Sequence, residues 1–290
     1  FCLSRGLGDV YKRQQILLTG DDFSDRKRYI NSRNTILTLL ELGITPVINE
    51  NDTVATEEIK FGDNDNLSAL VAGLIGAERL FILSDVDGLY DRDPRMYKDA
   101  TLIKRLNAQD LKRKEILHMA GGSTTGVGTG GMYSKILAAR KATDYGITVH
   151  IINGRLIGLE GKLIKRILEG EEIGTVILPG KERLSSRKGW IAFSARAKGS
   201  IVIDDGAVRA IKEMGKSLLP SGIVGVQGSF DTGDAVYCVD RKGIKVAKGL
   251  TNYSSEEINK IKGKKTSEIE ETLGYKYSDE VIHRDNLILV

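Results

Sequence analysis

Residues 43–52 read GITPVINEND, and this stretch decides the fold. Gly43 closes a segment in which apolar residues from Tyr29 to Leu40 recur every three or four positions, the spacing of an amphipathic helix. Residues 45–48 form a short apolar run typical of a buried strand, and asparagine and carboxylate side chains follow directly. A helix, a glycine turn and a buried strand in this order predict an α/β domain.

The same alternation extends from residue 15 to about residue 180. Further helices are expected at 67–75 and 135–145, and further strands at 80–83, 148–152 and 174–178. Apolar strands separated by amphipathic helices predict an open, mostly parallel sheet sandwiched by helices. Ligands of such sheets bind at the carboxyl ends of the strands, so the search for a site starts there.

The composition changes after Pro179. Residues 181–189 are short and charged, which is typical of a linker. Beyond them, short β-like runs are broken by Gly and Asp turns, and this pattern predicts a small β-barrel-like domain. The expected domains are 15–180, 190–264 and a C-terminal tail at 265–290. Residues 1–14 follow neither a helical nor an alternating pattern and are interpreted as an atypical segment foreign to the domain.

Composition narrows the class of protein. The 290 residues carry 43 Lys and Arg against 39 Asp and Glu, and a net charge of +4 does not argue for nucleic-acid binding. The two cysteines, Cys2 and Cys238, have no metal-type spacing and form no disulfide framework. No apolar run approaches the roughly 20 residues that a membrane span needs. These features predict a soluble, cytoplasmic protein.

Three polar clusters lie where the strand-end rule directs attention. The first combines residues 49–52 (NEND) with residues 62–66 (GDNDN) at the start of the next helix. For Asn66 alone, a helix cap is the simpler interpretation. Together, neighbouring amides and carboxylates can hold a zwitterionic amino acid, since carboxylates pair with its ammonium group and amides meet its carboxylates.

The second cluster, residues 84–90 (SDVDGLY), follows the strand expected at 80–83. A calcium loop is excluded by spacing, because Gly88 falls at the fourth position instead of the sixth and Met96 stands at the twelfth. A plain surface turn stays open as an alternative. The functional interpretation is a loop that contacts a nucleotide.

The third cluster is the glycine-rich stretch at 121–135 (GGSTTGVGTGGMYSK), which leads into a helix. Such a backbone can direct several N–H groups at phosphate oxygens, the helix N-terminus favours anions, and Lys135 supplies a cation. It is not a Walker A loop, which requires Gly-Lys-Ser/Thr. A flexible glycine linker is the competing interpretation.

The three clusters together predict phosphoryl transfer, which requires positioning of the acceptor and neutralisation of charge. A carboxylate acceptor is already ionised and needs no general base. His118, His150 and His283 are scattered without metal-binding or nucleophile–base spacing, so we interpret them as structural or surface residues.

Residues 46–52 (PVINEND), 61–70 (FGDNDNLSAL) and 126–135 (GVGTGGMYSK) resemble the glutamate 5-kinases of the amino-acid kinase family, and residues 190–263 are similar to a PUA domain. The resemblance implies ATP-dependent phosphorylation of the side-chain carboxylate of L-glutamate to L-glutamyl 5-phosphate, the first step of proline biosynthesis. It also implies ATP with Mg²⁺, feedback inhibition by proline at or near the glutamate pocket, and a homo-oligomer assembled through the kinase domains.

The resemblance further implies roles for single residues. Lys135 would stabilise charge on the transferred phosphoryl group, and Asp63 would organise the active-site lysines. The implied glutamate-binding residues are Asn49, Asp52, Asn64 and Asp65. The implied nucleotide-binding residues are Ser84, Asp85, Thr129, Gly130, Gly131, Met132, Tyr133, Ser134 and Lys135. No residue is implied as a metal ligand.

The chain departs from the family at its start. Family members begin with a strand and a glycine-rich loop bearing an ATP-contacting lysine, followed by a Ser-Gly-Ala segment that touches glutamate. Residues 1–14 offer Gly6, Gly8 and Lys12 but no preceding strand. We therefore expect an N-terminally truncated copy that is inactive alone, because losing these contacts removes several kcal/mol of transition-state stabilisation.

Two other functions stay open. A sibling kinase would use the same fold on aspartate, N-acetylglutamate or uridylate. An RNA-binding protein would use the PUA-like domain and the basic residues Lys181, Arg183, Arg187, Lys188, Arg196 and Lys198. A charge run is usually a solvated face, and no row of aromatic side chains accompanies this one.

Overall fold

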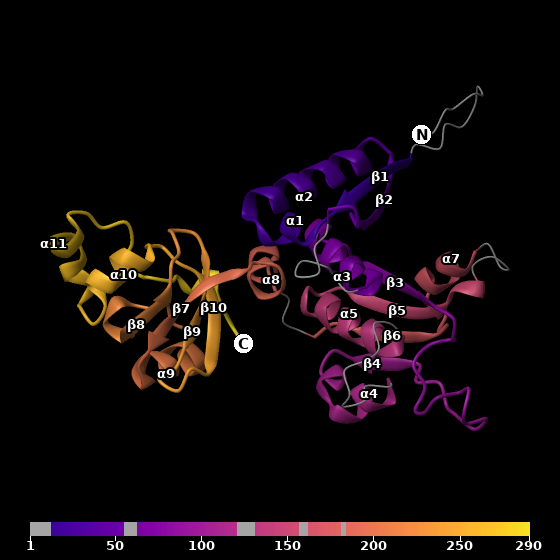
Figure 1. Ribbon diagram of the computed structural model, residues 1–290. Helices are drawn as coiled ribbons and strands as arrows, with labels where there is room; N and C mark the ends of the chain where they lie inside the picture. The colour runs from indigo at the N-terminus through magenta and orange to yellow at the C-terminus, as the bar shows by residue number, and fades with distance from the viewer. Residues whose placement is uncertain (1–12, 55–62, 121–130, 157–161, 181–183) are drawn as a thin grey trace. The chain divides into compact units, whose positions relative to one another are not determined.

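The computed structural model describes residues 13–54, 63–120, 131–156, 162–180 and 184–290. The chain divides into two compact units, Phe1–Ser186 and Arg187–Val290 (Figure 1). The division falls inside the range expected as a linker, 181–189, but it lies within a helix, α8 (Ser186–Phe193). A regular element therefore occupies part of the segment that composition alone marked as flexible.

The first unit alternates strands and helices along the chain. Its elements are β1 (Arg13–Leu18), α1 (Gly20–Ser24), α2 (Arg26–Glu41), β2 (Thr45–Glu50), α3 (Asn64–Ile75), β3 (Arg79–Ser84), β4 (Arg105–Asn107), η1 (Asp110–Lys112), α4 (Lys114–Met119), α5 (Met132–Asp144), β5 (Thr148–Asn153), α7 (Leu163–Leu168) and β6 (Thr175–Leu178). Every helix and strand that the sequence predicted between residues 24 and 178 is present, with bounds shifted by a few residues.

The described strands of this unit form two sheets. β1 and β2 pair in parallel, and the second sheet has the order β3-β5-β6-β4. Within it, β3 pairs with β5 and β4 with β6 in parallel, whereas β5 and β6 run antiparallel. The expected sheet is thus mostly parallel. β1 begins at Arg13, opposite Thr45, so the last two residues of the segment expected to be foreign belong to a strand.

The helix that precedes β2 shows how sequence sets the local structure. Asp25 caps α2, with its side chain accepting a hydrogen bond from the Arg28 backbone N–H at 2.9 Å. Tyr29 and Ile36 are buried on the inner face of the helix. Gly43 then takes a φ of +69°, a conformation that residues with a Cβ rarely adopt, and the chain turns into β2.

Helices cover both faces of the larger sheet. α3 and α5 pack against each other and against β3 and β5, and α7 contributes Leu163 and Ile167 to a separate cluster with Ile152 of β5. As a result, residues 149–152 of β5 are buried from end to end. Strand β5 is therefore the covered central strand that a continuous apolar run predicts.

The second unit is rich in β structure. Its elements are β7 (Ala197–Ile203), α9 (Asp205–Met214), η2 (Pro220–Gly222), β8 (Ile223–Gly228), β9 (Ala235–Val239), β10 (Lys245–Leu250), α10 (Ser255–Ile261), η3 (Thr266–Glu268), α11 (Ile269–Leu273), η4 (Arg284–Asn286) and β11 (Leu287–Leu289). The five strands form one sheet in the order β11-β10-β9-β7-β8.

Residues 265–290 differ from the tail that the sequence predicted. They supply α11 and β11, and β11 pairs antiparallel with β10. Ile269, Val281 and Ile282 from this segment are fully buried in the core of the second unit. Because these apolar side chains leave water only by joining that core, the segment folds as part of the domain.

Gly73 gives a test of the α3–α5 packing. A Cβ at this position would lie 2.6 Å from the Tyr145 ring, which is only 4% exposed. We expect Gly73→Ala to lower the free energy of unfolding by about 1–3 kcal/mol, although alanine is the better helix former. Denaturant unfolding measures the change.

The matched control is Gly180→Ala, because a Cβ added there meets nothing within 4 Å and Gly180 is exposed. Gly73→Ala stability equal to or above that of the parent chain would contradict the close approach of the two helices.

Candidate active site

The order of helices and strands places two helix N-termini at one edge of the sheet. α3 leads through Gly76 into β3, and α5 leads through Gly146 into β5. Each helix packs on the strand that follows it and therefore runs antiparallel to it. The first turns of α3 and α5 consequently lie at the edge where β3 and β5 end.

An ion pair joins these two helix starts. Lys135 Nζ lies 3.0 and 3.2 Å from the two carboxylate oxygens of Asp65. Ser134 Oγ lies 2.8 Å from Asp65 Oδ2 and 2.9 Å from the Gly131 carbonyl oxygen. The side chains of Lys135 and Asp65 are 14% and 18% exposed, so the pair is shielded from most of the solvent. A cation is thus fixed at the start of α5 by a carboxylate from the start of α3.

The N-terminus of α5 fits an anionic group. Gly131 occupies the cap position with a φ of +101°, and a glycine has no side chain that could cap the helix. The N–H groups of the first turn of a helix have no partner within it, and they carry the positive end of the helix dipole. With Lys135 beside them, these donors suit a phosphate group. Thr129 and Gly130, also predicted to contact the nucleotide, lie outside the described residues.

The two carboxylates at the start of α3 have different partners. Asp63 caps the helix, because its Oδ1 accepts a hydrogen bond from the Asn66 backbone N–H at 2.7 Å. Lys141 Nζ donates to Asn66 Oδ1 at 2.5 Å. Burial lowers the pKa of Lys141, and the charge of Asp63 opposes that shift. The charge of Asp63 therefore favours the protonated form of Lys141. Asp65, which was predicted to bind the acceptor, forms the ion pair with Lys135.

Polar side chains also meet where β3 and β5 end. Ser84 lies opposite Asn153 in the strand register, and it is buried, whereas Asp85 is exposed. Asn153 Nδ2 donates to Asp87 Oδ1 at 2.9 Å, which ties the end of β5 to the loop after β3. Asn153 was not among the predicted site residues. The strand-end rule could have found it, because it directly follows the apolar run at 148–152.

The predicted residues of β2 stand apart from this cluster. Asn49 lies opposite Leu17 of β1, Asp52 follows the strand in a turn, and both side chains are exposed. In the described part of the chain, no hydrogen bond or ion pair joins Asn49 or Asp52 to Asp65 or Lys135. Asn64 is also exposed, at the first position of α3. The helix itself packs against β2 as well as β3.

Among the described residues there is neither a helix that could span a membrane nor a cluster that could bind a metal ion. No described helix has the length and apolar character that crossing a bilayer demands. Within the same residues, no three His, Cys, Asp or Glu side chains gather in a group that could hold a metal ion. The candidate site is therefore defined by the helix starts and strand ends described above.

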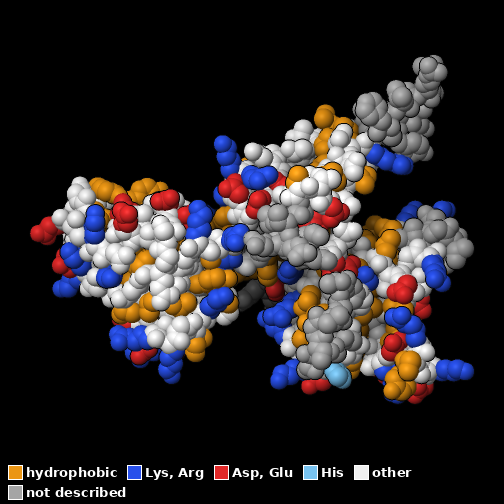
Figure 2. Space-filling model, viewed as in Figure 1, with side chains coloured by type: hydrophobic (Ala, Val, Ile, Leu, Met, Phe, Trp, Pro, Cys, Tyr) orange, Lys and Arg blue, Asp and Glu red, His pale blue; other side chains and the backbone are white. Residues whose placement is uncertain are grey.

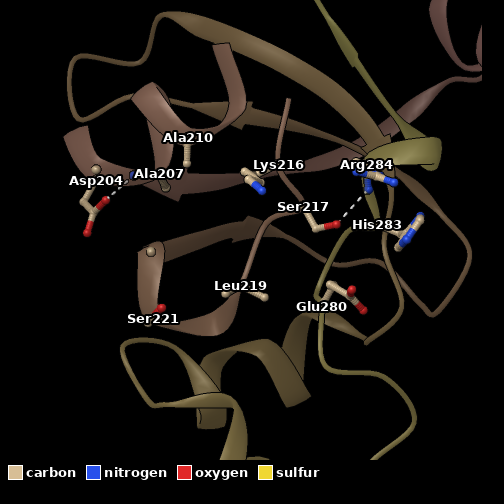
Figure 3. A pocket seen from close by; sticks show the side chains of 12 residues that line it. Asp204, Ala207, Ala210, Lys216, Ser217, Leu219, Ser221, Glu280, His283 and Arg284 are labelled. Atoms are coloured by element: carbon tan, nitrogen blue, oxygen red, sulfur yellow. Dashed lines mark hydrogen bonds between the residues drawn. The ribbon is translucent and has the colours of Figure 1, made fainter. Parts of the chain in front are cut away.

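The second unit has a pocket of about 610 Å³ with charges of both signs (Figure 3). Asp204 lies at one end, where it caps α9, Arg284 lies at the other, and Lys216 lies between them. Figure 2 likewise shows basic and acidic side chains interspersed over the face of this unit that is in view. Lys198, one of the basic residues considered for RNA binding, forms an ion pair with Asp234 at 2.8 Å. Lys181 and Arg183 lie outside the described residues, and RNA binding stays a prediction.

Known proteins match both units. The profile of the amino acid kinase family matches residues 9–153, and the profile of the PUA domain matches residues 199–273. A glutamate 5-kinase from Caldanaerobacter subterraneus subsp. tengcongensis is 54% identical over 276 residues, which cover 95% of this chain and 72% of that protein. The chain belongs to the glutamate 5-kinase family. A second glutamate 5-kinase, from Syntrophotalea carbinolica, is 50% identical over 275 residues, with the same coverage of the two chains.

Family membership confirms the predicted fold class, an α/β amino-acid kinase-like fold followed by a β-rich PUA domain. The kinase match starts at residue 9, inside the segment that the sequence interpretation set apart as foreign. It ends at Asn153 and so contains every predicted site residue of this member of the glutamate 5-kinase family.

Asp63 allows the capping role to be separated from any role in the reaction. We expect Asp63→Ala to lower the free energy of unfolding by about 1 kcal/mol, because the Asn66 N–H loses its acceptor. Asp63→Asn keeps an acceptor oxygen and should retain the stability while removing the charge that acts on Lys141. Thermal and denaturant unfolding of both variants measure the difference, and equal losses in the two would contradict the capping role.

Proposed function

We propose that this chain transfers the terminal phosphoryl group of ATP to the side-chain carboxylate of L-glutamate, forming L-glutamyl 5-phosphate, the first step of proline biosynthesis. The observation that carries the proposal is the pairing of Lys135 with Asp65 at the start of α5, on the sheet edge where β3 and β5 end. The 54% identity to a protein named glutamate 5-kinase supports the choice of acceptor.

The acceptor side of the reaction demands little acid–base chemistry. A glutamate carboxylate has an ordinary pKa of about 4.3 and is ionised at neutral pH, so it can attack without a general base. The protein must hold it in line with the phosphoryl group and balance the negative charge. We assign acceptor binding to Asn49, Asp52, Asn64 and Asp65. Asn49 lies near the end of β2 and Asp52 follows that strand. Both side chains are exposed and so accessible to an acceptor.

The nucleotide side is assigned to Ser84 and Asp85 and to the glycine-rich stretch Thr129–Lys135. The N–H groups at the start of α5, where the cap residue Gly131 has no side chain, would meet phosphate oxygens, and Lys135 would stabilise charge on the transferred group. Asp65 holds the Lys135 ammonium group in place before substrate arrives. Mg²⁺ bound with the nucleotide would neutralise phosphate charge, and it commonly needs only one or two protein carboxylates.

Two further properties belong to the proposal. Proline would act as a feedback inhibitor at or near the glutamate pocket, and the kinase domains would assemble into a homo-oligomer. Both rest on the family resemblance, and both are open to direct measurement by inhibition kinetics and by the mass of the protein in solution.

Lys135→Met tests the proposed role of the ammonium group. Removing one preorganised charge from a transition state typically costs a factor of about 10²–10³ in kcat, and we expect a loss of that size. Lys135→Arg should recover part of the activity because it restores a cation. Glutamate-dependent ADP release measures both variants.

Lys165→Met is the matched control, because this lysine is exposed on α7 and its ion pair among the described residues is with Glu169. The assignment of Lys135 would be wrong if Lys135→Met and Lys165→Met showed the same kcat.

The acceptor is tested with a panel of glutamate, aspartate, N-acetylglutamate and uridylate. We expect ADP release with glutamate alone. The assay should use this chain and also a version preceded by the N-terminal segment of the Caldanaerobacter relative, so that an incomplete site is not mistaken for a wrong acceptor. If the folded, extended protein released no ADP with glutamate but phosphorylated another acceptor, the chain would be a sibling kinase specific for that acceptor.

The expectation that this chain is inactive alone stays a prediction. The comparisons, which cover 95% of the chain, lend it no support. Assaying this chain beside its extended version measures the difference directly. Comparable turnover by the two proteins would remove this expectation and leave the proposed reaction intact.

A further inference from the structure

A hollow in the kinase unit lies on the face of the sheet that α7 covers. It measures about 280 Å³. Its floor includes His150, Val176 and Arg105, which lie opposite one another across β5, β6 and β4 in the strand register. Residues directly opposite in neighbouring strands point to the same face of a sheet. The end of α7 and residues 170–174 form the wall.

This hollow is separate from the candidate active site. β3 begins beside it at Arg79, and β5 begins beside it at Thr148. The same strands end at Ser84 and Asn153, next to the helix starts described above. Five residue steps along a strand correspond to about 17 Å. A molecule bound in the hollow would therefore lie beyond contact with the reacting groups.

Positive charge is in excess around the hollow. Arg79, Lys104 and Arg105 line it, and none of them forms an ion pair with a carboxylate of the described residues. Two carboxylates also line it. Glu171 is engaged by Arg166 Nη2 at 2.5 Å, which leaves Glu172 as the carboxylate without an ion pair among the described residues. Three cationic side chains therefore line the hollow together with one carboxylate that has no ion pair among the described residues, that of Glu172.

His150 places a buried polar side chain in the floor of the hollow. The side chain is 5% exposed and stacks on the Phe81 ring, with ring centroids 4.8 Å apart. Arg79 Nη1 lies 3.2 Å from His150 Nε2. A guanidinium group can only donate, so Nε2 accepts and the ring proton resides on Nδ1. Burial and, secondarily, the charge of Arg79 lower the pKa of His150 to about 4, so the ring is neutral at pH 7.

We propose that this hollow binds a small oxyanion, the phosphate or carboxylate group of a metabolite of about amino-acid size, between Arg79 and Arg105. Guanidinium groups match the geometry of both kinds of oxyanion and bind them through paired hydrogen bonds. Lys104 adds a third cation, and Ile173 and Val176 offer apolar surface to the remainder of the ligand. The occupant is an effector and not a reactant, and its binding does not depend on the proposed kinase activity.

Histidine signals in the NMR spectrum test this site. The chain contains three histidines, so selective isotope labelling yields three ring signals, which His118→Gln and His283→Gln variants assign. We titrate inorganic phosphate and, separately, malonate at constant ionic strength. The expected result is a saturable shift of the His150 signal, with a Kd on the order of 1 mM or tighter.

Variants distinguish a built site from general charge attraction. Arg105→Gln should weaken binding by about 10-fold or more, because a charged hydrogen-bond donor is lost. Arg95→Gln is the matched control, since Arg95 is exposed and pairs with Asp93 instead of lining the hollow. Lys135→Met should leave the His150 shift unchanged, which excludes an effect of phosphate bound at the candidate active site.

The titrations also identify the ligand chemistry. A shift with phosphate alone assigns a phosphate site, a shift with malonate alone assigns a carboxylate site, and both together assign a general oxyanion site. No saturable shift of His150 with either anion up to about 20 mM, or equal affinity in Arg105→Gln and Arg95→Gln, overturns the proposal. Kinase activity or its absence has no bearing on either outcome.

Discussion

The arrangement of the kinase unit depends on the ion pair between Asp65 and Lys135, which are 70 residues apart in the chain. The pair ties the first turn of α3 to the first turn of α5, and it does so where both side chains are largely withdrawn from water. A partly buried ion pair is sensitive to the loss of either member, because the remaining charge is left without compensation. The same contact that fixes two helix starts therefore holds a cation where phosphate would arrive.

The two acidic residues at the start of α3, Asp63 and Asp65, have different structural roles. Asp63 satisfies a backbone N–H of its own helix, and its charge supports the ammonium group of Lys141. Asp65, two positions later, forms an ion pair with Lys135 of the neighbouring helix. Local structure and long-range organisation are thus served by carboxylates only two residues apart, because Asp63 is the extended cap residue whereas Asp65 lies within the first helical turn.

Sequence patterns predicted the elements of the kinase unit well because its strands are continuous apolar runs and its helices have regular apolar spacing. They could not predict that β6 runs antiparallel to β5, since strand direction depends on how the intervening chain returns to the sheet. Nor could they distinguish Asp63 from Asp65, because the lysines on which the two charges act, Lys141 and Lys135, lie on another helix. The neutral, stacked state of His150 likewise arises from β3 and β5 pairing in register. Residues 265–290 were misjudged because their buried residues are spaced irregularly, between short helical turns.

The pairing of β11 with β10 also has a consequence for the timing of folding. β11 comprises Leu287–Leu289 and forms one edge of the five-stranded sheet, while Val281 and Ile282 complete the core beneath it. During synthesis, a domain can close only when its last contributing residues have left the ribosome. The described strands of the kinase unit are complete by residue 178, whereas the second sheet stays open at β10 until residue 289 has been made. Folding of the second domain is therefore the later event, and for that interval β10 presents an unpaired edge to other chains.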